Sequence, residues 1–332
     1  MPGVVSTGAS LAADAALEAT VVLSFSRVGC AVRRRLFDWS DPPVGRLAGR
    51  VAVVTGPTGG LGQAIATRLA RLGATVWLLG RDEEKTAALA GRIALGVPGA
   101  DVRVALADLG RPADVRAVAG RLLGANQRMD ILIHNAGALV SRYRPTDFGV
   151  EVTAATNVVG PFLLTSLLMP LLRRTAGSRV ITVSSGGMYT QRLDVAALDP
   201  DPAGFGGVAA YARTKRAQVV LSEEWSRRTA GTGIAFHATH PGWVDTPGLR
   251  ASLPTFARSM RPVLRSPGEG VDTIIWLTWA PEANPGGRFW HDRRPRSSVR
   301  LPGTGTPAGE AERLWAWAAA RAGLPVAAAG VP

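Results

Sequence analysis

A glycine-rich turn between a predicted strand and a predicted helix constrains this chain more than any other feature. The apolar run at residues 51–54 indicates a buried strand, and residues 59–72 have the apolar spacing of a helix. The sequence between them is Thr55-Gly56-Pro57-Thr58-Gly59-Gly60-Leu61-Gly62. Glycines placed there permit a tight turn, a close approach of the backbone to phosphate groups and close packing of the helix on the strand. The turn therefore predicts a site for the pyrophosphate of a dinucleotide.

Short apolar runs alternate with helical periods along most of the chain. Further strands are expected at residues 75–79, 102–106, 131–133, 180–183 and 234–239, with helices between them at 83–93, 112–123, 150–172 and 209–229. This alternation predicts an α/β fold, a Rossmann-type doubly wound parallel sheet in a single domain. We expect that domain to span residues 50–300, after an N-terminal helical extension (1–49) and before a C-terminal loop and helix (301–332), the helix lying at 308–322.

The net charge of +13 at neutral pH by itself suggests nucleic acid or an acidic membrane surface as a partner. However, every basic residue except Lys85 and Lys215 is an arginine, and the arginines form no single tract. Their densest groups, at residues 33–35 and 293–296, are not interleaved with stacking aromatic residues. We therefore predict no nucleic-acid partner, and we predict no metal site.

The N-terminal segment is not apolar enough to span a membrane. Its most apolar stretch is residues 19–26, well short of the ~20 residues that a spanning helix needs. Residues 17–36 follow a helical stripe, which leaves two interpretations: an amphipathic helix packed on its own domain or on a second subunit, or a helix on a membrane surface that ends in the basic residues 33–35. Cys30 is the only cysteine, which suits a reducing compartment. We expect a cytoplasmic protein, with peripheral membrane contact and homo-oligomer formation as open alternatives.

The end of the second strand indicates which dinucleotide binds. A carboxylate there suits the ribose diol of NAD, whereas a cation suits the 2′-phosphate of NADP. This chain has Gly80-Arg81-Asp82, and Arg81 offers several donors to a phosphate. We therefore predict NADP (NADPH) rather than NAD. In the alternative interpretation Arg81 is a surface residue paired with nearby acids, and Asp82 reaches the diol itself.

The next two strands end in further candidates. Asp108 follows the third strand, where a short acid can contact the adenine amino group. The small residues at 135–137 leave room for the ribose after the fourth strand. His134 precedes them as a candidate ligand or base, although a lone histidine at a strand end is more often a structural residue.

Tyr211 and Lys215 are the main candidates for catalytic residues. They lie four residues apart at the start of a predicted helix, so they share one face. A lysine can bind a ribose as a compact cation and lower the pKa of a phenol, which otherwise is about 10. A hydroxyl of Ser184 or Ser185, at the end of the fifth strand, can orient a substrate oxygen. Asn157 lies inside a long predicted helix, where a polar amide is unfavourable unless it has a task such as holding water on a proton path to Lys215.

These residues together resemble the short-chain dehydrogenase/reductase family. The motifs that carry the resemblance are Thr55-Gly56-x-x-x-Gly60-x-Gly62, Asn135-Ala136-Gly137, Asn157, Ser185, Tyr211-x-x-x-Lys215 and Pro241-Gly242-x-Val244-x-Thr246. Residues 180–188, 240–248 and 287–295 are similar to the dehydrogenase/reductase member-twelve-like branch of that family. The chain departs from the family pattern at Gly59, at His134, and in a long stretch between Ser185 and Tyr211 that implies an extra loop at residues 194–205.

The resemblance implies an oxidoreductase that transfers a hydride between NADP(H) and a carbonyl or alcohol. It makes Tyr211 the general acid/base and Ser185 the residue that positions the carbonyl, while Lys215 binds the nicotinamide ribose and Asn157 completes the proton relay. The predicted cofactor-binding residues are Gly56, Thr58, Gly60, Leu61, Gly62, Arg81, Asp108, Leu109, Asn135, Ala136, Gly137, Tyr211, Lys215, Pro241, Gly242, Val244 and Thr246.

Two other functions are compatible with such a fold, which hosts many activities. One is a regulatory or scaffold protein that binds a nucleotide and has an idle site. The other is an epimerase or dehydratase on a nucleotide sugar, against which the glycine spacing argues. Residues 247–279 should cover the substrate pocket, and their apolar side chains suggest an apolar ligand such as a lipid, a steroid-like ketone or a polyketide ketone. A packed core helix explains them equally well; they are Leu249, Leu253, Phe256, Met260, Leu264, Ile274, Ile275 and Trp276.

Overall fold

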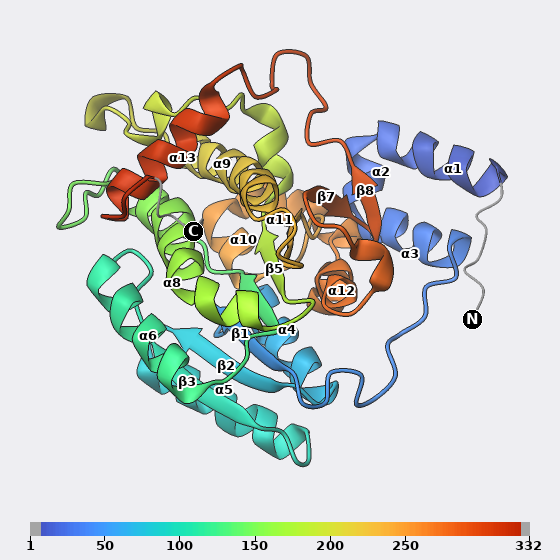
Figure 1. The fold of residues 1–332 in the computed structure, drawn as a ribbon. Coiled ribbons are helices and arrows are strands. Elements are labelled where there is room, and N and C mark those ends of the chain that lie inside the picture. The colour runs from blue at the N-terminus through green and yellow to red at the C-terminus, as the bar shows by residue number, and fades with distance from the viewer. Residues whose placement is uncertain (1–7, 327–332) are drawn as a thin grey trace.

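The computed structural model describes residues 8–326 and is built around one eight-stranded sheet. The strands lie in the order β3-β2-β1-β4-β5-β6-β7-β8 (Figure 1). Their bounds are Val51–Thr55 (β1), Thr75–Gly80 (β2), Val102–Leu106 (β3), Ile131–His134 (β4), Arg179–Val183 (β5), Ala235–Thr239 (β6), Arg288–His291 (β7) and Arg294–Arg296 (β8). All neighbouring strands pair in parallel except β7 and β8. The strand order reverses between β1 and β4, so their carboxyl ends flank the crevice where such sheets bind ligands.

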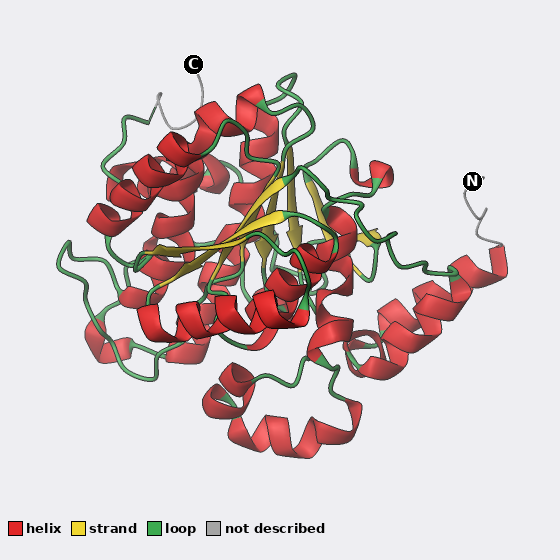
Figure 2. Cartoon of the chain, turned by 90° about the horizontal axis from the view of Figure 1, so that it is seen from below, coloured by secondary structure: helices red, strands yellow, loops and turns green. Residues whose placement is uncertain are grey.

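Helices cover both faces of the sheet (Figure 2). One face packs against α4 (Gly60–Arg71), α5 (Glu83–Gly96) and α12 (Pro267–Leu277). The other packs against α6 (Pro112–Ala125), α8 (Gly160–Arg174) and α9 (Gly207–Arg228), and α13 (Glu310–Arg321) packs in turn on α8 and α9. The predicted Rossmann-type fold, with its helical extensions at both ends, is confirmed.

Several predicted elements differ in detail. The helix expected at 150–172 is a short helix α7 (Val152–Ala154), a π-helical turn (Ala155–Val159) and α8. Pro161 falls where the helix changes form, because its ring nitrogen has no N–H to donate. The C-terminal helix begins at Glu310 rather than at residue 308, since Gly309 has a left-handed backbone with φ of 78°. Strands β7 and β8 were not predicted.

The N-terminal segment forms three helices instead of one: α1 (Gly8–Ala19), α2 (Val21–Phe25) and α3 (Arg27–Leu36). Thr20 and Ser26 interrupt the helical stripe with extended backbone. Helices α2 and α3 pack closely, since a Cβ on Gly29 would lie 2.2 Å from the carbonyl oxygen of Leu23. Among the two interpretations of this segment, the packing favours a helical extension held by its own domain.

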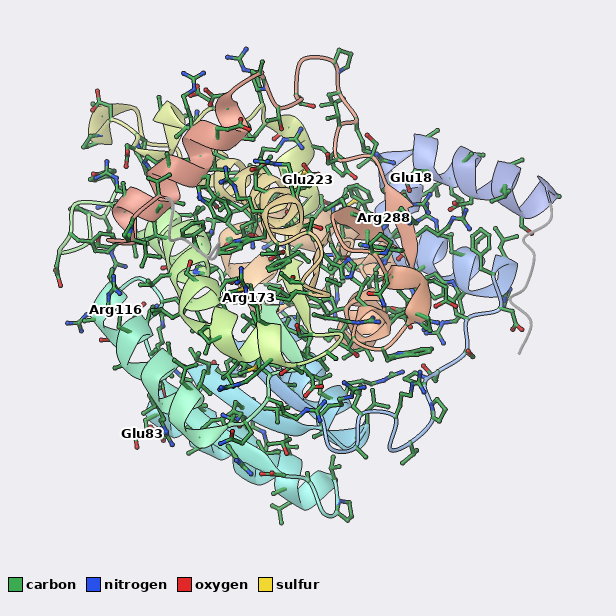
Figure 3. The ribbon with its side chains drawn as sticks, viewed as in Figure 1. Glu18, Glu83, Arg116, Arg173, Glu223 and Arg288 are labelled. Atoms are coloured by element: carbon green, nitrogen blue, oxygen red, sulfur yellow. The ribbon has the colours of Figure 1, made fainter. Side chains whose placement is uncertain are left out.

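An ion-pair cluster attaches this extension to the sheet. The Arg33 side chain is fully buried, and its guanidinium donates to Asp14 of α1 and to Asp292 of the β7–β8 turn, both at 2.7 Å. The Asp292 carboxylate also accepts from Arg265 at 2.6 Å. Glu18 of α1 pairs with Arg33 and faces the chain beyond β8 (Figure 3). Arg33 therefore belongs to the interior and not to an exposed basic run, which corrects that part of the membrane-surface interpretation.

The helical region from Val152 to Arg174 is apolar enough and long enough to cross a membrane by composition alone. However, 78% of its most apolar window is buried within the fold. Its leucines pack on α6 and on the sheet, so its composition is explained by its position in the core.

Candidate active site

The glycine-rich turn forms a tight cradle at the carboxyl end of β1. Gly56 has a left-handed φ of 61°, and a Cβ there would lie 2.7 Å from the Cα of Ala136. A Cβ on Gly62 would lie 2.1 Å from the carbonyl oxygen of Gly56. Larger residues at either position would push the turn away from β4 or from α4. The turn thus keeps its backbone exposed beside the N-terminus of α4, as pyrophosphate binding requires.

Asn135 braces this cradle from the neighbouring strand. Its Nδ2 donates to the carbonyl oxygens of Thr55 at 3.1 Å and Gly56 at 2.9 Å. In return, the Thr55 hydroxyl accepts from the backbone amides of Asn135 and Ala136, both at 3.0 Å. The Asn135 side chain therefore holds the turn in place, which is a task that the sequence interpretation of residues 135–137 did not include.

The end of β2 offers one uncommitted cation. Asp82 is the N-cap of α5, where it accepts from the Lys85 backbone amide at 3.0 Å and pairs with the Lys85 ammonium at 2.7 Å. Arg81 is exposed and makes no ion pair with any residue from 8 to 326. A Cβ on Gly80 would lie 2.2 Å from the Thr86 hydroxyl, so no carboxylate side chain fits there. The alternative in which Arg81 pairs with Asp82 is therefore not found in the structure.

The other predicted cofactor residues lie along the same edge of the sheet. Asp108 accepts from the Gly110 amide at 2.8 Å and so shapes the turn after β3, while Leu109 is buried beneath it. A Cβ on Gly60 would lie 3.0 Å from Thr246, which places the loop after β6 directly across the glycine turn. Thr246 itself caps α10 (Pro247–Ser252). Thr58, Leu61, Pro241 and Gly242 are half-buried along this edge, and Val244 is buried against it.

Tyr211 and Lys215 project from the first turns of α9 toward Ser185, which follows β5. The Lys215 ammonium lies 5.4 Å from the centre of the Tyr211 ring, and the lysine is only 3% exposed. Burial raises the pKa of Tyr211 to about 12, and a hydrogen bond with the Ser185 side chain opposes this shift. The phenol therefore keeps its proton near neutral pH and can give it to a carbonyl oxygen placed beside Ser185.

Asn157 lies in the π-helical turn and points at the loop after β4. Its Oδ1 accepts from the Ala138 amide at 2.7 Å, and its Nδ2 donates to the Ala138 carbonyl at 3.1 Å and to Thr214 at 2.9 Å. The side-chain amide thus joins three elements around Lys215. π-helical turns inside α-helices occur often at functional sites.

Gln218 is the residue near Lys215 that the sequence analysis missed. The Lys215 ammonium donates to the Gln218 Oε1 at 2.9 Å and to the Val183 carbonyl at 2.8 Å. The Gln218 Nε2 donates to the backbone carbonyl of Asn157 at 2.6 Å. Its side chain therefore takes the place of the expected water between Asn157 and Lys215. Its position three residues after Lys215, on the same helix face, was the available signal.

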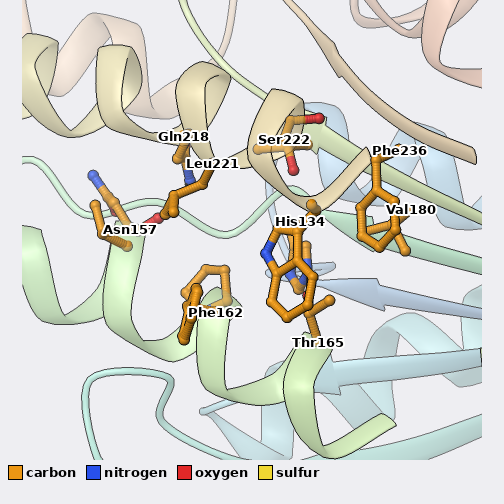
Figure 4. A pocket seen from close by; sticks show the side chains of 13 residues that line it. His134, Asn157, Phe162, Thr165, Val180, Gln218, Leu221, Ser222 and Phe236 are labelled. Atoms are coloured by element: carbon orange, nitrogen blue, oxygen red, sulfur yellow. Dashed lines mark hydrogen bonds between the residues drawn. The ribbon is translucent and has the colours of Figure 1, made fainter. Parts of the chain in front are cut away.

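His134 lies beyond Gln218 in a small internal pocket (Figure 4). Its Nε2 shares a hydrogen bond of 2.7 Å with the Thr165 hydroxyl. Burial lowers the pKa of His134 to about 3, so the ring is neutral. The structure favours the structural interpretation of this histidine over a role as ligand or base.

Phe25 of α2 reaches the opposite side of the site. A Cβ on Gly186, next to Ser185, would lie 2.7 Å from the Phe25 ring. The Phe25 carbonyl accepts from the Trp243 amide at 2.8 Å, in the loop after β6. The N-terminal extension thus supports two loops that carry predicted site residues. No local pattern around residue 25 indicated this contact.

The region predicted to cover the substrate pocket divides in two. Ile274 and Ile275 belong to the core, with 0% and 2% of their surface exposed, and they pack with residues of the sheet. Helix α10 and helix α11 (Pro254–Met260) instead carry partly exposed apolar side chains, and Phe256 meets the Trp243 ring edge-on at 5.1 Å. A packed core helix therefore explains the apolar residues of α12, but not those of α10 and α11.

Known proteins resemble this chain over most of its length. A family model described as short chain dehydrogenase matches residues 50–255. Dehydrogenase/reductase SDR family member 12 of Bos taurus is 38% identical over 272 residues, which cover 81% of this chain and 85% of that protein. Retinol dehydrogenase 12 of Bos taurus is 34% identical over 277 residues, with 81% and 85% covered. Among solved structures, the Pseudomonas aeruginosa RhlG/NADP active-site complex is 29% identical, with a TM-score of 0.62, 75% of this chain and 96% of that chain being covered.

Proposed function

The chain belongs to the short-chain dehydrogenase/reductase family, in its member-twelve-like branch, and we propose that it transfers a hydride between NADP(H) and a carbonyl or alcohol of an apolar substrate. As a member of this family it is an oxidoreductase that acts on CH–OH or C=O groups with a nicotinamide cofactor. The preference for NADP and the apolar substrate are the parts that we propose.

The observation that carries the proposal is the arrangement of Tyr211, Ser185 and Lys215 at the edge where the glycine cradle opens. The cradle fits a dinucleotide, since side chains are sterically excluded at Gly56 and Gly62. The bound nicotinamide supplies or accepts the hydride. Tyr211 gives its proton to the substrate oxygen during reduction, and Ser185 orients that oxygen. Lys215 binds the ribose, and its positive charge lowers the pKa of the phenol.

The cofactor preference follows from the end of β2. Arg81 is free to bind a 2′-phosphate, while Asp82 is engaged with Lys85 and Gly80 admits no carboxylate side chain. The NADP complex of the similar Pseudomonas aeruginosa protein supports the same choice. We assign the remaining contacts along this edge to the residues predicted from the sequence, from Thr58 and Leu61 in the turn to Pro241, Val244 and Thr246 after β6.

The substrate class rests on aromatic side chains of the loop after β6 and of α11, which Phe25 links to Gly186, the neighbour of Ser185. Trp243 and Phe256 are half-buried there, and the similar retinol dehydrogenase is named for an apolar alcohol. An apolar ketone or alcohol matches these aromatic side chains better than a charged sugar nucleotide. The extra loop has short helical turns at Ala196–Leu198 and Pro202–Gly204, and Phe205 at its end meets the Tyr143 ring edge-on at 5.8 Å.

We also propose how the chain is organised and where it acts. The family domain spans residues 50–300, between an N-terminal extension (1–49) and a C-terminal loop and helix (301–332). The protein is cytoplasmic, with weak peripheral contact to membranes through α2 and α3. Val21, Val22 and Val28 support this contact, because they are 49%, 51% and 43% exposed on those helices.

The function is tested by mixing the purified protein with NADPH and a panel of apolar aldehydes and ketones. We expect NADPH absorbance to fall with at least one of them, and to fall more slowly when NADH replaces NADPH. An idle nucleotide-binding protein would bind NADPH, seen as a change in its fluorescence, without oxidising it with any member of the panel or forming it from NADP and the matching alcohols.

A further inference from the structure

We propose that Gln218 is a positioning residue of this site: its side-chain amide holds the Lys215 ammonium and occupies the gap between Lys215 and the backbone carbonyl of Asn157. The proposal rests on the proposed function, in which Lys215 binds the cofactor ribose and acts on Tyr211. It adds that the Gln218 side chain, and not a water molecule, makes the direct link between Lys215 and the Asn157 carbonyl.

The hydrogen bonds give the amide a single orientation. An ammonium can only donate and a backbone carbonyl can only accept. The Gln218 Oε1 must therefore face Lys215, at 2.9 Å, and its Nε2 must face Asn157, at 2.6 Å. All three residues are almost completely buried, so these bonds exclude water and are costly to lose.

The Asn157 carbonyl is available because of the local sequence. In a regular α-helix it would accept from the amide four residues later, but that residue is Pro161, which has none. The π-helical turn Ala155–Val159 widens the backbone at the same point. Gln218 supplies the missing donor from α9, seven residues after Tyr211 and on the same face of that helix.

Gln218 thereby limits what Lys215 can do. Of the three N–H groups of the ammonium, Val183 and Gln218 accept two, which leaves one for a ligand or for Tyr211. A neutral amide does not pass protons as water does, because its nitrogen is not basic. The proton that Tyr211 gives up must then be replaced from the open side of the site, and not through α8.

Two substitutions separate positioning from simple packing. Gln218→Met keeps the volume but removes one of the two acceptors of the Lys215 ammonium and the side-chain donor to the Asn157 carbonyl, so we expect kcat to fall by about ten- to a hundredfold. Gln218→Ala leaves room for water to restore both bonds, so we expect a smaller loss. Gln127→Met, at an exposed position remote from the site, is the matched control. If Gln218 only filled space, the order would reverse, with methionine tolerated and alanine more damaging, and the proposal would be wrong.

A second measurement does not depend on turnover. The chain has only two lysines, so ¹⁵N NMR of the lysine side chains should resolve Lys215, with the exposed Lys85 as an internal reference. Burial already lowers the pKa of Lys215 to about 7. We expect Gln218→Met to lower this pKa further and Gln218→Glu to raise it, since a carboxylate stabilises the ammonium. An unchanged pKa in both variants would overturn the proposal.

The two measurements keep this inference separate from the proposed function. If the wild-type protein oxidised NADPH with no member of the panel, the proposed function would fail, while the expected pKa changes would still support the contact between Gln218 and Lys215. If the wild type were active and both Gln218→Met and Gln218→Glu left kcat and the pKa of Lys215 unchanged, the positioning role alone would fail. Thermal melting of each variant identifies any that does not fold, and Gln218→Ala then provides the comparison.

Discussion

At the scale of single residues, the chemistry depends on a phenol that the protein keeps protonated. Burial raises the pKa of Tyr211 to about 12, and Ser185 is its hydrogen-bonding neighbour. We predict that Tyr211→Phe lowers kcat by about 10²–10⁴-fold, the usual contribution of general acid–base catalysis. NADPH affinity, measured by fluorescence titration, should stay within a fewfold of wild type, because the hydroxyl acts on the substrate oxygen. Tyr143→Phe is the matched control. Near-normal turnover in Tyr211→Phe would contradict the assignment of Tyr211 as the general acid/base.

Arg81 supports a second prediction at this scale. Arg81→Asp should weaken NADPH binding by about ten- to a hundredfold, because a charge-assisted contact to the 2′-phosphate is lost and a repulsive charge is added. NADH binding should hold or improve, since the new carboxylate can accept from the ribose diol. Arg92→Asp makes the same charge change at an exposed position of α5 and should leave the ratio of the two affinities unaltered. A wild-type protein that binds NADH more tightly than NADPH would contradict the assignment.

At the scale of elements, the N-terminal helices depend on one buried arginine. Arg33→Met would leave Asp14 paired with Arg296, and Asp292 paired with Arg265, but would remove the buried guanidinium that joins these two carboxylates. A hydrogen bond to a charged group contributes about 1.5–3 kcal/mol, so we expect a loss of about this size. Urea unfolding should show this loss of unfolding free energy, while Arg35→Met in the same helix, at an exposed position, should change it by less than about 0.5 kcal/mol. Equal stabilities of the two variants would mean that the cluster contributes little.

The same cluster predicts how stability depends on pH. Arg265 and Arg33 hold the pKa of Asp292 below its ordinary range, although burial by itself would raise it. A carboxylate with a depressed pKa in the folded state stabilises the fold above its unfolded pKa, and this contribution is lost as the pH falls toward the folded pKa. Unfolding free energies measured below about pH 4 should therefore fall less steeply in Asp292→Asn than in the wild type. Parallel pH profiles would argue against a depressed pKa.

At the scale of the whole molecule, the exposed apolar side chains of α2 and α3 combine with an excess of positive charge. Val22 and Val28 are 51% and 43% exposed, and the chain carries a net charge of +13. We predict that the protein sediments with anionic lipid vesicles at low salt and less at high salt, because screening weakens exposed charges. The double variant Val22→Glu and Val28→Glu should sediment much less, with Leu95→Glu, which alters an exposed leucine of α5, as the control. Equal sedimentation of all three proteins would exclude contact through these helices.

Much of the fold was predictable because its signals are local. The strand, glycine turn and helix around Gly56, and the apolar runs of the first six strands, depend on spacing within a few residues. The fold class and the family are confirmed. The roles of Asn157, Ser185, Tyr211 and Lys215 stay predictions, although the structure brings Ser185, Tyr211 and Lys215 to one edge of the sheet and Asn157 beside them.

The sequence by itself determined the parallel sheet, the cofactor turn and the pair of residues on one face of α9, since periodicity and spacing follow from backbone geometry. Only the tertiary structure decided that Phe25 supports Gly186, that Arg33 is buried against Asp292, and that Gln218 stands between Lys215 and Asn157. These contacts join residues that are far apart in the chain. Their energies come from burial and from hydrogen bonds between particular atoms, and no local pattern records which distant partner each atom meets.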